Sequence, residues 1–340
     1  MKSLRMTKDY FMIVSLFILL TNCGGGGGGN NNGGDDQIEV NQWDSIGPGG
    51  GGVNARAIDP LDQNIMYEGT GNSGTGAGAL FKSANAGNDW IPVGIDVIKG
   101  NVRCIAIDSV TDTTIYVGNL NGLFKSIDGG TNWTMLLSGW TESVVIDNVN
   151  PEILYMATVN KISKSTDEGA HWSIINTGLP AGEFNAYPLI IDPITKTTLY
   201  VYVYIGGQDQ GLYKSNDGGA HWNVINSSDI YLPNTLSVDP TTSTTLYAGM
   251  NTGVKKSTDG GAHWTSINNG LPQPNIKVKS IIPISSKTIY MAGTIPNNTN
   301  TDTNVLYVSN DGGSIWIAIN TDVLNNVPAL NYFTLDQLTP

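Results

Sequence analysis

One pattern occurs six times along the chain, and this repetition constrains the fold more than any other feature. Each copy has an apolar segment that ends at an aspartate in five of the six copies, a tyrosine further on, a segment of the type LFKS, and a turn that leads to a tryptophan. The tyrosines Tyr67, Tyr116, Tyr155, Tyr200, Tyr247 and Tyr290 recur roughly every 45 residues. Each tyrosine follows eight residues after Asp59, Asp108, Asp147, Asp192, Asp239 and, in the sixth copy, Ile282.

The turn of each copy, called the repeat turn below, has the pattern Ser-x-Asp-x-Gly-x-x-Trp in five copies and Asn in place of Asp in the first. A short carboxylate there can accept backbone N–H groups of its own loop, and the glycine can adopt a positive φ. The tryptophan then offers a large apolar surface to a neighbouring unit. We therefore assign a structural role to the third residue of each turn, which is Asn85, Asp128, Asp167, Asp217, Asp259 or Asp311.

Four short strands per repeat of this length are typical of a β-propeller, in which each repeat forms one blade. The chain has 42 glycines and only 14 % charged residues, which suits short strands joined by tight turns. No segment keeps a helical apolar period over three turns. We predict an all-β propeller of four-stranded antiparallel blades.

The repeat turn resembles the Asp-box, or bacterial neuraminidase repeat, and this resemblance covers about residues 42–340. The layout DP…LYAG…VKKSTDGGAHW is similar to the propellers of sortilin-type receptors, oligoxyloglucan-cleaving hydrolases and photosystem II assembly factors. In these families the Asp-box is a structural turn away from the active face. The resemblance therefore implies a fold and leaves the function open.

Six complete blades do not account for the whole chain. The segment at Trp43 matches a fourth strand, and the segment at Tyr332 matches a first strand whose own tyrosine would fall beyond Pro340. We expect a partial seventh blade built from both ends and a propeller that is incomplete at its C-terminus. The alternative is a six-bladed ring with additional segments at its ends.

The first 22 residues have the features of a bacterial lipoprotein signal peptide. Lys2, Arg5 and Lys8 precede an apolar run that is too short to span a bilayer, and the run leads to Cys23. We expect lipidation of Cys23, a flexible Gly/Asn-rich tether over residues 23–41, and sorting to the outer membrane of a bacterium. An ordinary secretory signal with an incidental cysteine is the alternative.

Charge and composition exclude several function classes. The net charge of −12 argues against nucleic acid as a partner. Sialidases grip a carboxylate with three arginines, whereas only Arg56 and Arg103 follow the signal segment. His171, His221 and His263 each precede a repeat tryptophan on separate blades, so they cannot share a metal ion. We predict no cofactor, no metal and no catalytic residue.

The candidate ligand face is the one opposite the repeat turns, because loops on a rigid scaffold commonly carry binding. One residue per blade, five positions before the aspartate or its counterpart, is expected near the central channel: Asn54, Arg103, Glu142, Tyr187, Asn234, Lys277 and Asn331. Trp140, Phe184 and Tyr231 are candidate aromatic platforms. The alternatives are that the channel residues are merely solvated strand ends and that the aromatic rings pack beneath their own loops.

We expect a lipid-anchored, extracytoplasmic and monomeric binding or scaffold module for a protein or glycan partner, which contacts the membrane only through its anchor. The alternative is a glycoside hydrolase of the Asp-box class that uses loop carboxylates. Its candidates are Glu142, Glu183, Asp209 and Asp229. A glycosidase needs two carboxylates roughly 5–9.5 Å apart, and spacing in the sequence singles out no such pair.

Overall fold

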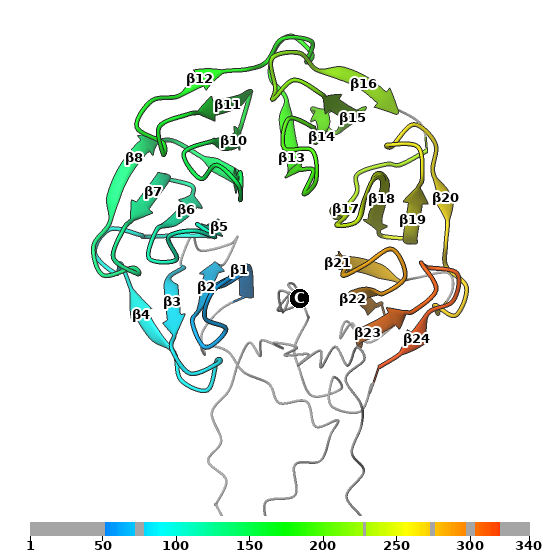
Figure 1. The fold of residues 1–340 in the computed structure, drawn as a ribbon, viewed down its shortest axis with the longest axis horizontal. Helices are drawn as coiled ribbons and strands as arrows, with labels where there is room; N and C mark the ends of the chain where they lie inside the picture. The colour runs from blue at the N-terminus through cyan, green and yellow to red at the C-terminus, as the bar shows by residue number, and fades with distance from the viewer. Residues whose placement is uncertain (1–51, 72–77, 227–228, 273–275, 297–302, 320–340) are drawn as a thin grey trace, which may run out of the picture.

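The computed structural model describes residues 52–71, 78–226, 229–272, 276–296 and 303–319. Its strands form six four-stranded antiparallel sheets, which stand as blades around a central axis (Figure 1). Each blade uses consecutive strands, with the first strand innermost and the fourth at the outer rim. The predicted all-β propeller with one blade per repeat is confirmed.

The first three blades have these bounds. Blade 1 contains β1 (Gly52–Ile58), β2 (Met66–Gly71), β3 (Leu80–Ser83) and β4 (Ile91–Val93). Blade 2 contains β5 (Val102–Ile107), β6 (Ile115–Asn119), β7 (Gly122–Ser126) and β8 (Thr134–Ser138). Blade 3 contains β9 (Thr141–Ile146), β10 (Leu154–Thr158), β11 (Lys161–Ser165) and β12 (Ser173–Ile174).

The other three blades follow the same order. Blade 4 contains β13 (Asn185–Ile191), β14 (Leu199–Ile205), β15 (Gln208–Ser215) and β16 (Asn223–Asn226). Blade 5 contains β17 (Thr235–Asp239), β18 (Thr242–Met250), β19 (Gly253–Ser257) and β20 (Thr265–Ser266). Blade 6 contains β21 (Lys277–Pro283), β22 (Ile289–Ile295), β23 (Thr303–Ser309) and β24 (Ile317–Ala318).

The hydrophobic core consists of separate clusters, and each lies between two neighbouring blades. Between blades 3 and 4, for example, Tyr155 and Ile162 pack with Leu199, Val201 and Trp222. In every described cluster that contains a repeat tryptophan, the indole packs against side chains of the preceding blade. The predicted role of the tryptophans between units is therefore confirmed.

The repeat turn is closed by its own serine and aspartate. In blade 4, the backbone N–H of Gly219 donates to Ser215 Oγ at 2.8 Å, and His221 N donates to Asp217 Oδ1 at 2.9 Å. Gly219 has φ 87°, which a residue with a Cβ resists. Asn85 takes the aspartate position in blade 1, where its Oδ1 accepts Asp89 N–H at 2.8 Å. These bonds confirm the predicted mechanism of the turn.

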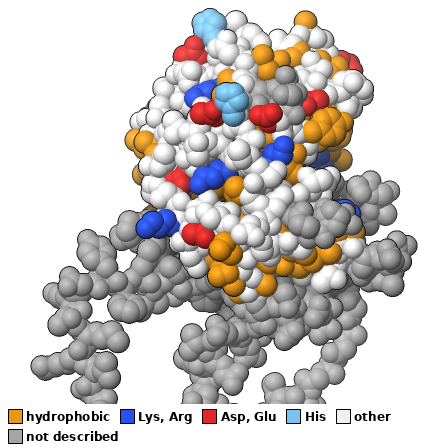
Figure 2. Space-filling view, turned by 90° about the vertical axis from the view of Figure 1, so that its right-hand side faces the viewer, with side chains coloured by type: hydrophobic (Ala, Val, Ile, Leu, Met, Phe, Trp, Pro, Cys, Tyr) orange, Lys and Arg blue, Asp and Glu red, His pale blue; other side chains and the backbone are white. Residues whose placement is uncertain are grey.

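Each histidine that precedes a repeat tryptophan pairs with the aspartate of its own turn. The distances from Nδ1 to Oδ2 are 2.6 Å for His171 and Asp167, 2.9 Å for His221 and Asp217, and 2.7 Å for His263 and Asp259. Figure 2, which views the molecule from the right-hand side of Figure 1, shows histidines at the surface beside acidic side chains. The histidines are therefore local partners of the repeat turns, as expected for equivalent positions on separate blades.

The assignment of Ile282 as the sixth copy of the strand-ending aspartate was wrong. Ile282 pairs with Tyr290, whereas in blade 2 the residue opposite Tyr116 is Ala106, two positions before Asp108. The equivalent of the aspartate in blade 6 is therefore Ile284, because the turn that follows is two residues shorter. Its capping bonds come instead from Ser285 Oγ, which accepts Lys287 N–H at 3.3 Å and Thr288 N–H at 3.1 Å.

Several predictions concern segments outside the described residues. These are the signal segment, Cys23, the tether, and the partial seventh blade at Trp43, Tyr332 and Asn331. The described residues contain no helix, and hence none that is long and apolar enough to cross a membrane.

Candidate functional site

Five of the six inner strands have a β-bulge near their start, which turns a side chain toward the channel. In β1, β5, β9 and β21 the pairing register skips Asn54, Arg103, Glu142 and Lys279. In β13 it skips Tyr187 together with the next residue. A bulge re-aims the extra side chain out of the regular alternation. Four of these residues belong to the ring that the sequence predicted, so the periodic position has a structural basis.

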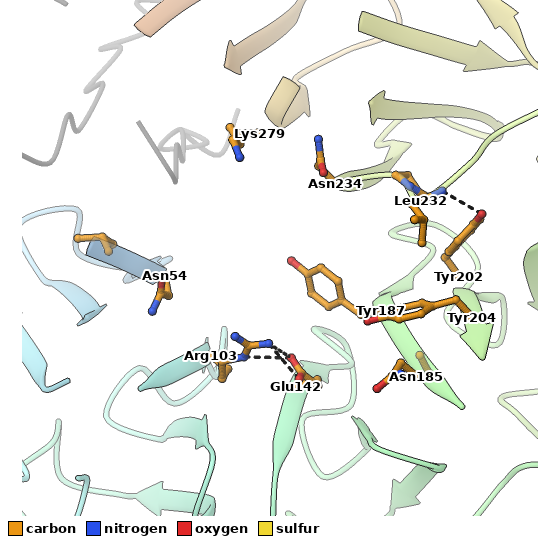
Figure 3. Close-up of a pocket in the computed structure, with 13 residues that line it drawn as sticks. Asn54, Arg103, Glu142, Asn185, Tyr187, Tyr202, Tyr204, Leu232, Asn234 and Lys279 are labelled. Carbon is orange, nitrogen blue, oxygen red and sulfur yellow. Dashed lines mark hydrogen bonds and ion pairs between the residues drawn. The ribbon is translucent and has the colours of Figure 1, made fainter. Parts of the chain in front are cut away.

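These side chains line a cavity of about 490 Å³ at the mouth of the channel (Figure 3). The cavity lies where the inner strands begin. In an antiparallel blade with strands in order, this is the face opposite the turns between third and fourth strands. Blade 4 and the segment before β17 supply the rest of its wall, with Asn185, Ala186, Tyr202, Tyr204, Leu232, Pro233 and Asn234, and Val53 completes it. The volume lies in the range of small-molecule sites.

An ion pair between two blades forms one side of the cavity. Arg103 donates from Nε to Glu142 Oε2 at 3.0 Å and from Nη2 to both carboxylate oxygens at 3.0 and 2.7 Å. The guanidinium also lies 5.6 Å from the ring centroid of Trp140. The side chains of Arg103 and Glu142 are 34 % and 15 % exposed, so the pair is held in place yet still reachable.

Tyr187 projects into the cavity from β13 toward the opposite wall (Figure 3). The residue is 39 % exposed, and burial of its ring against the channel wall raises the pKa of its phenol. Burial raises the pKa of Tyr204 as well. Both phenols therefore stay protonated at neutral pH and can donate a hydrogen bond. A protonated phenol beside an apolar ring face can contact both polar and apolar parts of a ligand.

The structure brings four of the seven predicted ligand-face residues together and separates the other three. Arg103, Glu142 and Tyr187 line the cavity, and Trp140 stacks on the arginine. Phe184 is 2 % exposed and packs in the core between blades 3 and 4, as the alternative interpretation predicted. Tyr231 is 58 % exposed and lies outside the cavity lining.

Lys277 does not line the cavity; the lysine that does is Lys279. The prediction counted five residues back from Ile282, whereas the structural counterpart of the aspartate is Ile284. Counting five residues back from Ile284 gives Lys279, which is also the bulged residue of β21. A shorter turn in blade 6 therefore shifted the predicted position by two residues.

Sequence reasoning also missed Asn185, Tyr202 and Tyr204. The two tyrosines lie in β14, which pairs with β15 as far as Ile205 and carries Tyr204 to the channel mouth. Tyr202 donates from its hydroxyl to Asp209 and accepts the backbone N–H of Leu232 at 3.0 Å. The alternating tyrosines of this strand were the available signal.

The candidate carboxylates occupy different places. Glu142 lines the cavity, whereas Glu183, Asp209 and Asp229 are not part of its lining. Asp209 accepts the Tyr202 hydroxyl at 2.5 Å, and Asp229 accepts the backbone N–H of Trp264 at 3.2 Å. Within the described ranges, no group of three or more His, Cys, Asp or Glu side chains is arranged to hold a metal ion.

Solved structures share this fold at low sequence identity. A xyloglucanase of the GH74 family from Xanthomonas campestris superposes with a TM-score of 0.64 and 17 % identity, over 83 % of this chain and 47 % of that one. The GH74 enzyme of Niastella koreensis gives 0.55 and 19 %, over 78 % of this chain and 59 % of its own. The chain thus spans about half the length of these enzymes.

A second kind of neighbour is matched over most of its own length. YCF48 bound to D1 peptide superposes with a TM-score of 0.59 and 16 % identity, over 81 % of this chain and 84 % of that one. No family model and no curated protein matches the sequence. At these identities the comparisons establish the β-propeller fold and nothing finer.

Proposed function

We propose that this chain is a non-catalytic binding module that takes a protein or glycan partner into the cavity at the channel mouth. The observation that carries the proposal is the cavity itself, where bulged residues of five inner strands converge on a face with no repeat turns. Rigid blades that hold variable residues around a common opening are suited to recognition. The neighbour YCF48 is a propeller of this fold, and its solved structure contains a bound peptide.

The alternative, a glycoside hydrolase, is favoured by the fold likeness to the GH74 enzymes. The carboxylates weigh against it. Both common mechanisms need an acid and a second carboxylate across the scissile bond. Of the four candidates only Glu142 lines the cavity, and Arg103 already holds both of its oxygens.

We infer the cellular location of the module from the signal segment. The proposal places it outside the cytoplasm, tethered to a bacterial outer membrane through lipid on Cys23. A Cys23→Ser variant should then lose incorporation of labelled palmitate and leave the membrane fraction. Palmitate labelling that persists in this variant would contradict the lipid anchor without touching the binding proposal.

Binding can be tested with the purified full chain in two ways: on a glycan array, and by capture of proteins from the cell envelope of the bacterium that produces it. The Tyr187→Ala variant should weaken binding of any captured partner at least tenfold, because the ring lines the cavity and projects into it (Figure 3). Tyr231→Ala is the matched control, since this exposed tyrosine lies outside the lining. Equal binding by the parent chain and the Tyr187→Ala variant would contradict the proposal. The hydrolase would be favoured if the chain released reducing ends from a glycan and the Glu142→Gln variant did not.

A further inference from the structure

Four polar side chains of the cavity wall have no hydrogen-bond or ion-pair partner within the described part of the chain. They are Asn185, Tyr187, Tyr204 and Lys279. By contrast, Asn234 uses its Nδ2 to bond Asn251 Oδ1 and Val278 O, both at 2.9 Å. Three of these groups belong to blade 4 and Lys279 belongs to blade 6, and all four line one cavity, so a ligand in it could contact several of them at once (Figure 3).

The cavity lining contains one more positive than negative side chain. Arg103 and Glu142 neutralise each other through their bidentate contact. Lys279 is the remaining charged residue of the lining, and it lies on the wall across from this pair (Figure 3). A single uncompensated ammonium in a concave site attracts one anionic group. This site stands out because the chain as a whole carries a net charge of −12.

The rest of the wall favours a compact polyhydroxylated ligand. Side-chain amides and phenols both donate and accept hydrogen bonds, as hydroxyl groups do. The exposed face of Tyr187 offers an apolar surface for the C–H groups of a sugar ring. A cavity of about 490 Å³ suits a small ligand better than an extended chain.

We propose that the cavity binds a small saccharide that carries one carboxylate, a sugar of the uronic acid class. The carboxylate pairs with Lys279, the ring lies against Tyr187, and the hydroxyl groups bond to Asn185, Tyr204 and the Arg103–Glu142 pair. This inference rests on the proposed binding function and names the chemistry of its ligand.

Calorimetric titration of the full chain with three matched sugars tests whether binding depends on the carboxylate charge of the ligand. D-Glucuronate should bind at least tenfold more tightly than D-glucose and than D-glucuronamide, which keeps the shape and lacks the charge. The Lys279→Gln variant should remove this preference. Lys277→Gln is the control, because it removes the same charge from the same strand outside the cavity lining. Equal binding of the three sugars, absence of glucuronate binding, or a preference that survives Lys279→Gln would overturn the inference.

A tetrapeptide with a free C-terminal carboxylate, compared with its amidated form, distinguishes the source of the carboxylate. Weaker binding of both peptides than of glucuronate supports the saccharide. Tighter binding of the free-acid peptide, dependent on Lys279, would overturn it and leave the binding module intact. The binding module itself fails only if capture of partners is insensitive to Tyr187→Ala.

Discussion

At the scale of single residues, the aspartate of the repeat turn makes equivalent contacts in several blades. Asp167 accepts bonds from the backbone N–H and the ring of His171 and from Ser165, and these donors lower its pKa to about 2. The same set of donors lowers the pKa of Asp217 and Asp259. The ionised carboxylate is therefore the form that fits the turn.

These pKa shifts predict a stability that depends on pH. The folded pKa lies below the ordinary value of 3.8, so the carboxylates stabilise the fold above about pH 4 and lose this contribution as the pH falls toward 2. The thermal midpoint should fall over this range. A triple variant with asparagine at positions 167, 217 and 259 should fall less steeply, since asparagine occupies the equivalent position 85 without titrating. Identical pH profiles, measured by circular dichroism, would contradict this.

At the scale of elements, the second and third strands of one blade bind the repeat turn of the next. Tyr67 Oη and Lys82 Nζ both donate to Gly129 O at 2.9 Å, and the ammonium lies 5.5 Å from the tyrosine ring centroid. The pair is adjacent because Tyr67 and Lys82 face each other in the register of β2 and β3. In blade 5, Lys256 makes this bond to Gly312 O, while Tyr247 Oη has no hydrogen-bond partner among the described residues.

This difference predicts unequal costs for one conservative substitution. Tyr67→Phe should lower the free energy of unfolding by about 1 kcal/mol, because it removes a partly buried hydrogen bond to a carbonyl. Tyr247→Phe should cost clearly less, since its hydroxyl is buried without a partner. Urea unfolding of the two variants measures both values. A larger loss for Tyr247→Phe would show that the contact between blades does not depend on the hydroxyl.

At the scale of the whole molecule, stability is the sum of blade-to-blade contacts. The described apolar clusters lie at successive blade interfaces, and the cluster between blades 3 and 4 shares no residue with the one between blades 5 and 6. Architectures of this kind are stabilised by nearest-neighbour terms. Because the apolar contacts lie between blades, the cavity at the channel mouth can be lined by polar side chains such as Arg103, Glu142 and Lys279.

Substitutions in distant interfaces should therefore act independently. Ile162→Val and Ile281→Val lie in these two clusters, and each should cost about 0.5–1.5 kcal/mol of unfolding free energy. The double variant should equal the sum to within about 0.5 kcal/mol. Ile162→Val combined with Val201→Ala, which share one cluster, serves as the coupled comparison. A coupling between the distant pair as large as in this comparison would contradict independent interfaces.

The sequence by itself determined the architecture, because the repeat turn, the tyrosine and the tryptophan act within one repeat or on its direct neighbour. Their spacing therefore predicted the blades and the positions that face the channel. The prediction from spacing failed in blade 6, where the turn after the first strand is two residues shorter, so Lys277 was named in place of Lys279. Only the tertiary structure decided which channel side chains meet. Three features depend on bulges and on contacts between blades, which no local pattern encodes: the pairing of Arg103 with Glu142, the burial of Phe184, and the place of Lys279, which has no partner among the described residues.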